Sequence, residues 1–157
     1  MPISNYLRNL RDKVGNTRLF LVGVTGVVIN DAGEILLHLR SDNGQWSLPG
    51  GALEPGEEPA DAVVREVWEE TGVKVVPERI VNVSSGADHL VKYPNGDEAI
   101  IMSVTFACRP IGGEPCVNDD ESLEVRYFSV DTLPQLAERH RFRIEQALRN
   151  DSRTHFR

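Results

Sequence analysis

The chain has 157 residues, with 40% hydrophobic and 26% charged residues, so we expect one globular domain over residues 1–157. The net charge of −7 and the lack of a dominant basic stripe argue against duplex nucleic acid as a partner. No apolar run approaches the length of a membrane span, and Cys108 and Cys116 are too few for a disulfide framework, so we expect a cytoplasmic protein with no membrane partner.

The first segment predicts a helical extension over residues 1–16. Ser4 can cap a helix over residues 5–14, and Gly15 can end it. A helix this short is marginal in isolation and must dock, either on the body or on a second subunit. The segment therefore leaves a homodimer open.

Strand patterns follow the extension. Residues 18–30 are rich in Val, Leu and Thr and predict a long strand. The turn at 31–33 predicts that residues 34–39 return beside that strand as a hairpin partner. Residues 46–48 predict a short strand that runs into two glycines.

Residues 60–71 predict a helix that stops before Gly72. Its apolar positions recur at helical spacing and form one stripe: Ala60, Val63, Val64, Val67 and Thr71. Glu66, Glu69 and Glu70 are neighbours on another face, where like charges repel unless a cation intervenes. Clustered carboxylates suit a hard divalent ion such as Mg²⁺, although a solvated acidic face is the alternative.

The second half contains further strands and a helix. Residues 73–76 and 80–84 predict strand pieces around Pro77, and residues 89–93 and 98–108 flank a tight turn at 94–97. Residues 125–130 predict a last strand, and residues 136–150 predict a C-terminal helix. The order indicates an α+β fold, a mixed β-sheet covered by helices.

A motif spans residues 51–73 and reads Gly-x5-Glu-x7-Arg-Glu-U-x-Glu-Glu-x-Gly-U, where U is apolar. Every fixed position is filled, by Gly51, Glu57, Arg65, Glu66, Val67, Glu69, Glu70, Gly72 and Val73. A match at this many constrained positions is very improbable by chance. The chain therefore resembles the Nudix hydrolases of the MutT-like type. The resemblance implies a Nudix-type α/β/α sandwich with a mixed β-sheet.

The resemblance also implies the chemistry. Nudix hydrolases cleave a diphosphate bond in a nucleoside diphosphate linked to another moiety, with Mg²⁺ as the cofactor, which Mn²⁺ can replace. Glu69 and Glu70 match the principal metal ligands of the family, and the Gly51 carbonyl matches a further one. Glu66 matches the residue that orients or deprotonates the attacking water, and it can also be a ligand.

An ion pair between Arg65 and Glu57 is expected to fix the preceding loop against the helix, in support of catalysis. A plain surface salt bridge is the alternative for this pair.

Candidate site residues outside the motif are supported only by their position or residue type. The acidic patch at residues 119–124, before the last predicted strand, lies where the family often supplies another metal-linked carboxylate. Glu121 is the first choice for this carboxylate and Asp120 is the second. Arg40 could bind a substrate phosphate, because a guanidinium matches phosphate geometry. Trp46 could stack on a substrate base, with core packing as the alternative.

The motif does not identify the substrate. His89 stands where a proline would indicate ADP-ribose, and Tyr93 is out of register with the marker for dinucleoside polyphosphates. ADP-ribose-like nucleotide sugars and (deoxy)nucleoside triphosphates therefore both stay open. The rival interpretation is a non-catalytic Nudix-fold nucleotide-binding or sensor module, which the complete set of carboxylates argues against.

Overall fold

The computed structural model describes residues 4–149 and 151–156. In chain order its elements are α1 (Asn5–Val14), β1 (Leu19–Val28), β2 (Ile35–Arg40), β3 (Trp46–Ser47), β4 (Gly50–Ala52), α2 (Pro59–Thr71), β5 (Lys74–Ser84), the 3₁₀ turn η1 (Ala87–His89), β6 (Leu90–Lys92), β7 (Glu98–Gly112), β8 (Ser122–Phe128), η2 (Val130–Thr132), α3 (Glu138–Leu148) and β9 (His155–Phe156).

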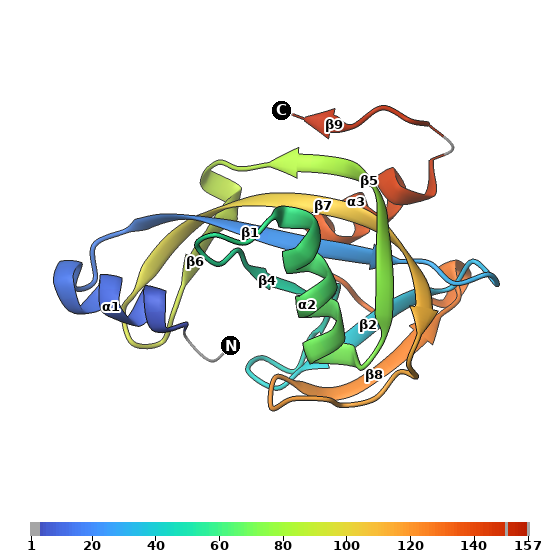
Figure 1. The fold of residues 1–157 in the computed structure, drawn as a ribbon, viewed down its shortest axis with the longest axis horizontal. Helices are drawn as coiled ribbons and strands as arrows, with labels where there is room; N and C mark the ends of the chain where they lie inside the picture. The colour runs from blue at the N-terminus through green and yellow to red at the C-terminus, as the bar shows by residue number, and fades with distance from the viewer. Residues whose placement is uncertain (1–3, 150, 157) are drawn as a thin grey trace.

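Two sheets form the body. The six-stranded sheet has the order β4-β1-β7-β5-β9, with β6 also paired to β7, and the three-stranded sheet has the order β3-β2-β8. Strands β1 and β7 run parallel, whereas β1 with β4 and β5 with β7 are antiparallel, so the large sheet is mixed. Helix α2 lies across one face of this sheet and α3 lies behind it (Figure 1). The expected α/β/α sandwich with a mixed sheet is confirmed.

The predicted hairpin between residues 18–30 and 34–39 is wrong. Strands β1 and β2 lie in different sheets and share only the bridge between Ile29 and Ile35. The reason is that both edges of β1 are occupied, one by β7 and the other by β4. Strand β2 therefore pairs with β3 and β8 instead.

Pro77 does not divide β5, which runs without a break from Lys74 to Ser84. The pairing with β7 shifts register between Pro77 and Arg79, and a bulge of this kind accommodates a residue without an N–H. The helix at the N-terminus is as expected: the Leu7 amide donates to the Ser4 hydroxyl, and the Gly15 amide donates to the Arg11 carbonyl.

Helix α1 docks on the turn between β6 and β7. The Arg11 guanidinium donates to the carbonyls of Thr17 and Glu98, at 2.6 and 2.9 Å, and lies 3.5 Å from the Asp97 carboxylate. No residue of α1 is buried, so this docking is polar.

Among the described residues, none of the helices is long and apolar enough to cross a membrane.

Candidate active site

The active-site helix α2 begins at Pro59, a residue suited to the first helical turn, and ends at Gly72 in the left-handed conformation with φ of 71°. Sequence spacing separates its glutamates from its apolar stripe, but the structure buries two of these glutamates as well as Val63, Val67 and Thr71 of the stripe. Glu66 and Glu70 are only 6% and 3% exposed, because α2 packs between the large sheet and β8. Glu69 remains 45% exposed in its side chain.

The two glycines that begin β4 face these carboxylates. The Gly50 amide donates to Glu70 Oε2 at 2.9 Å. A Cβ added at Gly51 would lie 2.5 Å from the Glu66 carboxyl carbon, and one added at Gly50 would lie 2.2 Å from the Val24 carbonyl oxygen. Glycine at position 51 therefore leaves room for the Glu66 carboxylate, and glycine at position 50 allows the close approach of β4 to β1.

Arg65 connects the motif. Its guanidinium binds Glu57 through two nitrogens, at 2.7 and 3.0 Å, and donates to the Ala52 carbonyl at 3.1 Å. Its Nη1 also donates to Glu66 at 2.8 Å and to Glu69 at 3.3 Å. Arg65 thus ties the loop before α2, strand β4 and two of the candidate metal ligands into one network.

Burial dominates the acid–base properties of the site. Desolvation raises the pKa of Glu66 to about 7, although the hydrogen bond from Arg65 opposes the shift. Desolvation also raises the pKa of Glu70 well above its usual value, against the opposing hydrogen bond from Gly50, and the nearby Glu66 charge adds to the rise. The Arg65 hydrogen bond, by contrast, lowers the pKa of Glu57. The two buried carboxyl groups are therefore poised to exchange protons or to accept a cation.

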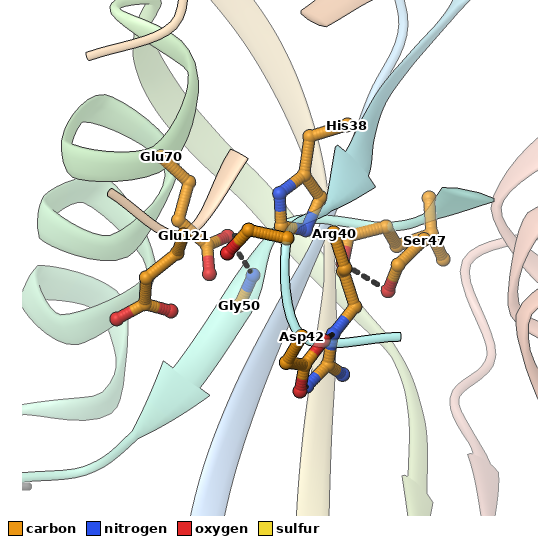
Figure 2. Close-up of a pocket in the computed structure, with 9 residues that line it drawn as sticks. His38, Arg40, Asp42, Ser47, Gly50, Glu70 and Glu121 are labelled. Carbon is orange, nitrogen blue, oxygen red and sulfur yellow. Dashed lines mark hydrogen bonds and ion pairs between the residues drawn. The ribbon is translucent and has the colours of Figure 1, made fainter. Parts of the chain in front are cut away.

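A small cleft of about 60 Å³ opens beside Glu70. Its lining comes from β2 and the following loop, from β3, β4 and the turn between them, from α2, and from the turn before β8: His38, Arg40, Ser41, Asp42, Ser47, Leu48, Gly50, Glu70 and Glu121. Figure 2 shows the Glu70 and Glu121 side chains on one side of the cleft and Arg40 with Asp42 on another. Burial raises the pKa of Glu121.

The structure thus brings Glu121 to the same cleft as Glu70, a carboxylate of the motif. Asp120 uses its backbone carbonyl to accept the Ser41 hydroxyl, and its side chain does not line the cleft. Arg40 reaches the cleft as well, where its guanidinium forms two hydrogen bonds with Asp42, at 2.9 and 2.5 Å.

Trp46 is not brought into this group. Its ring packs edge-on against Phe128, with centroids 4.8 Å apart, and it adjoins the apolar cluster that includes Leu48 and Ile144. The alternative interpretation, core packing beside the motif, describes its position.

A buried histidine that spacing did not single out lies beside Glu70. The Ser122 hydroxyl donates to the Glu70 carbonyl at 3.0 Å, so the proton shared between Ser122 and His38, 2.8 Å apart, belongs to His38 Nδ1. The other ring nitrogen, Nε2, then faces Glu70 Oε2 at 3.6 Å. The signal in the sequence is a histidine inside the apolar run of β2, where four successive positions are buried.

The donor set fits a hard divalent cation: carboxylate oxygens and a backbone carbonyl gathered around the two glycines that begin β4. Within residues 4–149 and 151–156, however, no group of three or more acidic, histidine or cysteine side chains already has the geometry of a metal site. The physical reason is that Glu66 and Glu69 turn toward Arg65, while Glu70 accepts the Gly50 amide. Metal binding would therefore require these side chains to reorient.

Comparison with known proteins identifies the class. The NUDIX domain family model matches residues 19–150, so the chain belongs to the Nudix hydrolase family. Two similar curated proteins are a MutT-like protein of Streptomyces ambofaciens, 38% identical over 83% of this chain and 78% of the relative, and an ADP-ribose pyrophosphatase of Methanocaldococcus jannaschii, 37% identical over 84% and 77%.

Solved structures agree with this assignment. An ADP-ribose pyrophosphatase from Streptococcus suis is 29% identical with a TM-score of 0.69, covering 87% of this chain and 98% of its own. A MutT Nudix hydrolase from Burkholderia pseudomallei is 30% identical with a TM-score of 0.64, covering 81% and 97%.

Proposed function

We propose that this protein hydrolyses a diphosphate bond in a nucleoside diphosphate linked to another moiety, and that the reaction depends on Mg²⁺ or Mn²⁺. The observation that carries the proposal is the pair of buried glutamates, Glu66 and Glu70, held against the two glycines that begin β4, beside a cleft that Glu121 also lines. Carboxylates are buried at this density only where a cation or a proton compensates their charge.

In this proposal Glu69, Glu70, Glu66, Glu121 and the Gly51 carbonyl hold the divalent ions. When bound, such ions supply positive charge that neutralises the diphosphate and acidifies water. Glu66 takes the proton from the attacking water. Arg65, fixed by Glu57, positions Glu66 and Glu69.

Arg40 is assigned to the substrate phosphate, because it lines the cleft and its fork can exchange Asp42 for phosphate oxygens. Trp46 stays a weaker expectation for base stacking. The homodimer and the cytoplasmic location also stay predictions.

The names of two relatives point to two classes of substrate. The M. jannaschii relative is named an ADP-ribose pyrophosphatase, and a Bacillus subtilis relative, 29% identical over 74% of this chain and 71% of its own length, is named a putative 8-oxo-dGTP diphosphatase. We propose nucleotide sugars such as ADP-ribose, or (deoxy)nucleoside triphosphates. A panel of both classes, assayed by phosphate or nucleotide release, is expected to show turnover that EDTA abolishes and Mg²⁺ or Mn²⁺ restores. Full turnover in chelator would exclude the mechanism.

The carboxylate outside the motif has its own test. Glu121→Ala is expected to weaken Mn²⁺ binding, measured by titration calorimetry, whereas Asp120→Ala is the matched control from the same loop. The physical reason is position: Glu121 lines the cleft with Glu70 and the Asp120 side chain does not. If both variants bind Mn²⁺ with equal affinity, the acidic patch is a solvated loop and Glu121 is not a metal ligand.

A further inference from the structure

The last turn of α2, which carries two of the proposed metal ligands, ends at Gly72. The last four carbonyls of an α-helix have no partner within the helix itself. The segment 113–122, which joins β7 to β8, supplies donors to three of these four carbonyls in α2. One donor is the backbone amide of Cys116, which lies 2.9 Å from the Thr71 carbonyl. The C-terminal end of α2 is therefore held by a segment much further along the chain.

The other two donors are side chains. The Asn118 amide donates to the Trp68 carbonyl at 2.8 Å, and the Ser122 hydroxyl donates to the Glu70 carbonyl at 3.0 Å. Both contacts hold the backbone of the helical turn whose side chains face the cleft. We call Asn118 and Ser122 the α2 clamp.

Ser122 joins two proposed metal ligands that are far apart in the chain. It directly follows Glu121, and its hydroxyl holds the backbone of Glu70. On the other side of Glu121, the Ser41 amide donates to the Glu121 carbonyl at 2.8 Å. Glu70 and Glu121 line the same cleft (Figure 2). The separation of these two carboxylates therefore depends on the contact between Ser122 and α2.

His38 fixes the direction of the Ser122 hydroxyl. A serine hydroxyl rotates to suit its partners, whereas the Glu70 carbonyl can only accept a hydrogen bond. His38 Nδ1 lies 2.8 Å from Ser122 Oγ, so it donates to this oxygen and leaves the serine proton for Glu70. His38 and Ser122 are only 3% and 4% exposed, so solvent has little access to either partner.

We propose that the α2 clamp positions the metal ligands, and that His38 acts through Ser122 in the same role. These are positioning residues: Ser122 sets the separation of Glu70 and Glu121, and His38 keeps the Ser122 hydroxyl directed at α2. Groups that orient metal ligands in this way change metal affinity without touching the ion. The inference rests on the proposed function, because it takes Glu70 and Glu121 to be metal ligands.

Removal of the serine hydroxyl tests the proposal by metal affinity in the absence of substrate. In Ser122→Ala the Glu70 carbonyl loses its donor, so we expect Mn²⁺ binding, measured by titration calorimetry, to weaken about tenfold or more. Ser103→Ala is the matched control, because Ser103 is as buried as Ser122 but its hydroxyl lies 3.4 Å from Thr25, away from α2. This control should bind Mn²⁺ like the parent.

Two substitutions separate the two ring nitrogens of His38. His38→Asn places an amide donor close to the position of Nδ1, whereas His38→Gln places one closer to the position of Nε2. We expect His38→Asn to keep most of the Mn²⁺ affinity and His38→Gln to lose it. A purely structural histidine would instead weaken binding in step with the loss of urea-unfolding free energy in each variant. The reverse order would assign the effect to Nε2, which faces Glu70, and would overturn the route through Ser122.

Asn118→Ala covers the case in which Ser122→Ala does not fold. Asn118 is exposed, so its replacement removes the bond to the Trp68 carbonyl without opening the core. We expect several-fold weaker Mn²⁺ binding. Asn95→Ala is the control, because Asn95 is also exposed and its amide bonds Asp97 in the turn between β6 and β7.

The outcomes separate this inference from the proposed function. If the parent binds Mn²⁺ and the folded clamp variants bind it equally well, the inference is overturned and the proposed function stands. If Ser103→Ala weakens binding as much as Ser122→Ala, the effect is a general loss of stability and the clamp is again excluded. A parent that binds no Mn²⁺ would overturn the proposed metal site, and the inference with it.

Discussion

At the scale of single residues, Gly51 has the most restrictive environment in the motif. A methyl group there would lie 2.5 Å from the Glu66 carboxyl carbon, so Gly51→Ala must displace that side chain. We expect kcat to fall about 10²-fold or more, since the displaced group is the proposed base. The matched control is Gly112→Ala, whose Cβ would meet only Lys74 at 3.9 Å. Equal kcat in the two variants would show that the Glu66 position is not critical.

Glu66→Gln separates charge from shape at the same site. The substitution keeps the volume and an acceptor for Arg65, but it removes the group that takes the proton. We expect kcat at saturating Mg²⁺ to fall by about 10²–10⁴-fold. The melting temperature without metal should stay level or rise, because a buried carboxyl that repels Glu70 is neutralised.

The exposed Glu145→Gln on α3 serves as the control for Glu66→Gln. A kcat for Glu66→Gln within a few-fold of the parent would move the role of base to another carboxylate, with Glu121 the first to examine.

The sequence predicts some residues of the candidate site and misses others. The motif places Glu57, Arg65 and the glutamates because their spacing is local, within one loop and one helix. His38 could not be found in this way, since its partners Ser122 and Glu70 lie far away in the chain. A lone histidine carries no spacing signal.

At the scale of elements, the loop before α2 is fixed to the helix by one guanidinium. Arg65 bonds Glu57 through two nitrogens and also reaches the Ala52 carbonyl, a geometry that lysine cannot reproduce. We expect Arg65→Lys to reduce kcat/KM by about 10–100-fold, as is common when a group that orients metal ligands is lost.

Arg109→Lys is the control for Arg65→Lys, because Arg109 forms an exposed ion pair with Glu78 on the strands β7 and β5. Measured Mn²⁺ affinity distinguishes the causes: weaker binding in Arg65→Lys supports a positioning role. Parent-like affinity together with parent-like kcat/KM would reduce the network to a surface salt bridge.

Local sequence patterns predicted the positions of the helices and strands better than they predicted which strands pair. The helices α1 and α2, and the hairpin of β6 and β7, lie close to their predicted positions because caps, periodicity and a tight turn are local signals. The separation of β1 from β2 was missed, because the parallel pairing of β1 with β7 joins residues about 80 positions apart. The burial of Glu66 and Glu70 was missed for a related reason: a helix covered on two sides hides more than its apolar stripe.

At the scale of the whole molecule, buried ionisable groups shift stability with pH in opposite directions. The pKa values of Glu66 and Glu70 are raised by burial, so their contribution to stability falls as the pH rises from about 4.5 through neutrality. Burial instead lowers the pKa of His38 to about 4 and that of His140 to about 3. Metal binding should offset the cost of burying the ionised Glu66 and Glu70 carboxylates, which is larger at high pH. Mg²⁺ is therefore expected to raise the melting temperature more at pH 8 than at pH 5.

His140 allows the effect of a buried histidine on stability to be measured at a residue that is not a proposed metal ligand. It is 6% exposed, and its folded pKa of about 3 lies below the unfolded value of 6.5. The unfolded chain therefore binds the extra proton between these values, so the stability that neutral His140 contributes is complete above pH 6.5 and is lost as the pH falls toward 3. We expect His140→Gln to flatten the pH dependence of the urea-unfolding free energy between pH 6.5 and 4 relative to the parent, by a few kcal/mol at most. Parallel curves for His140→Gln and the parent across that range would show that His140 does not couple folding to protonation.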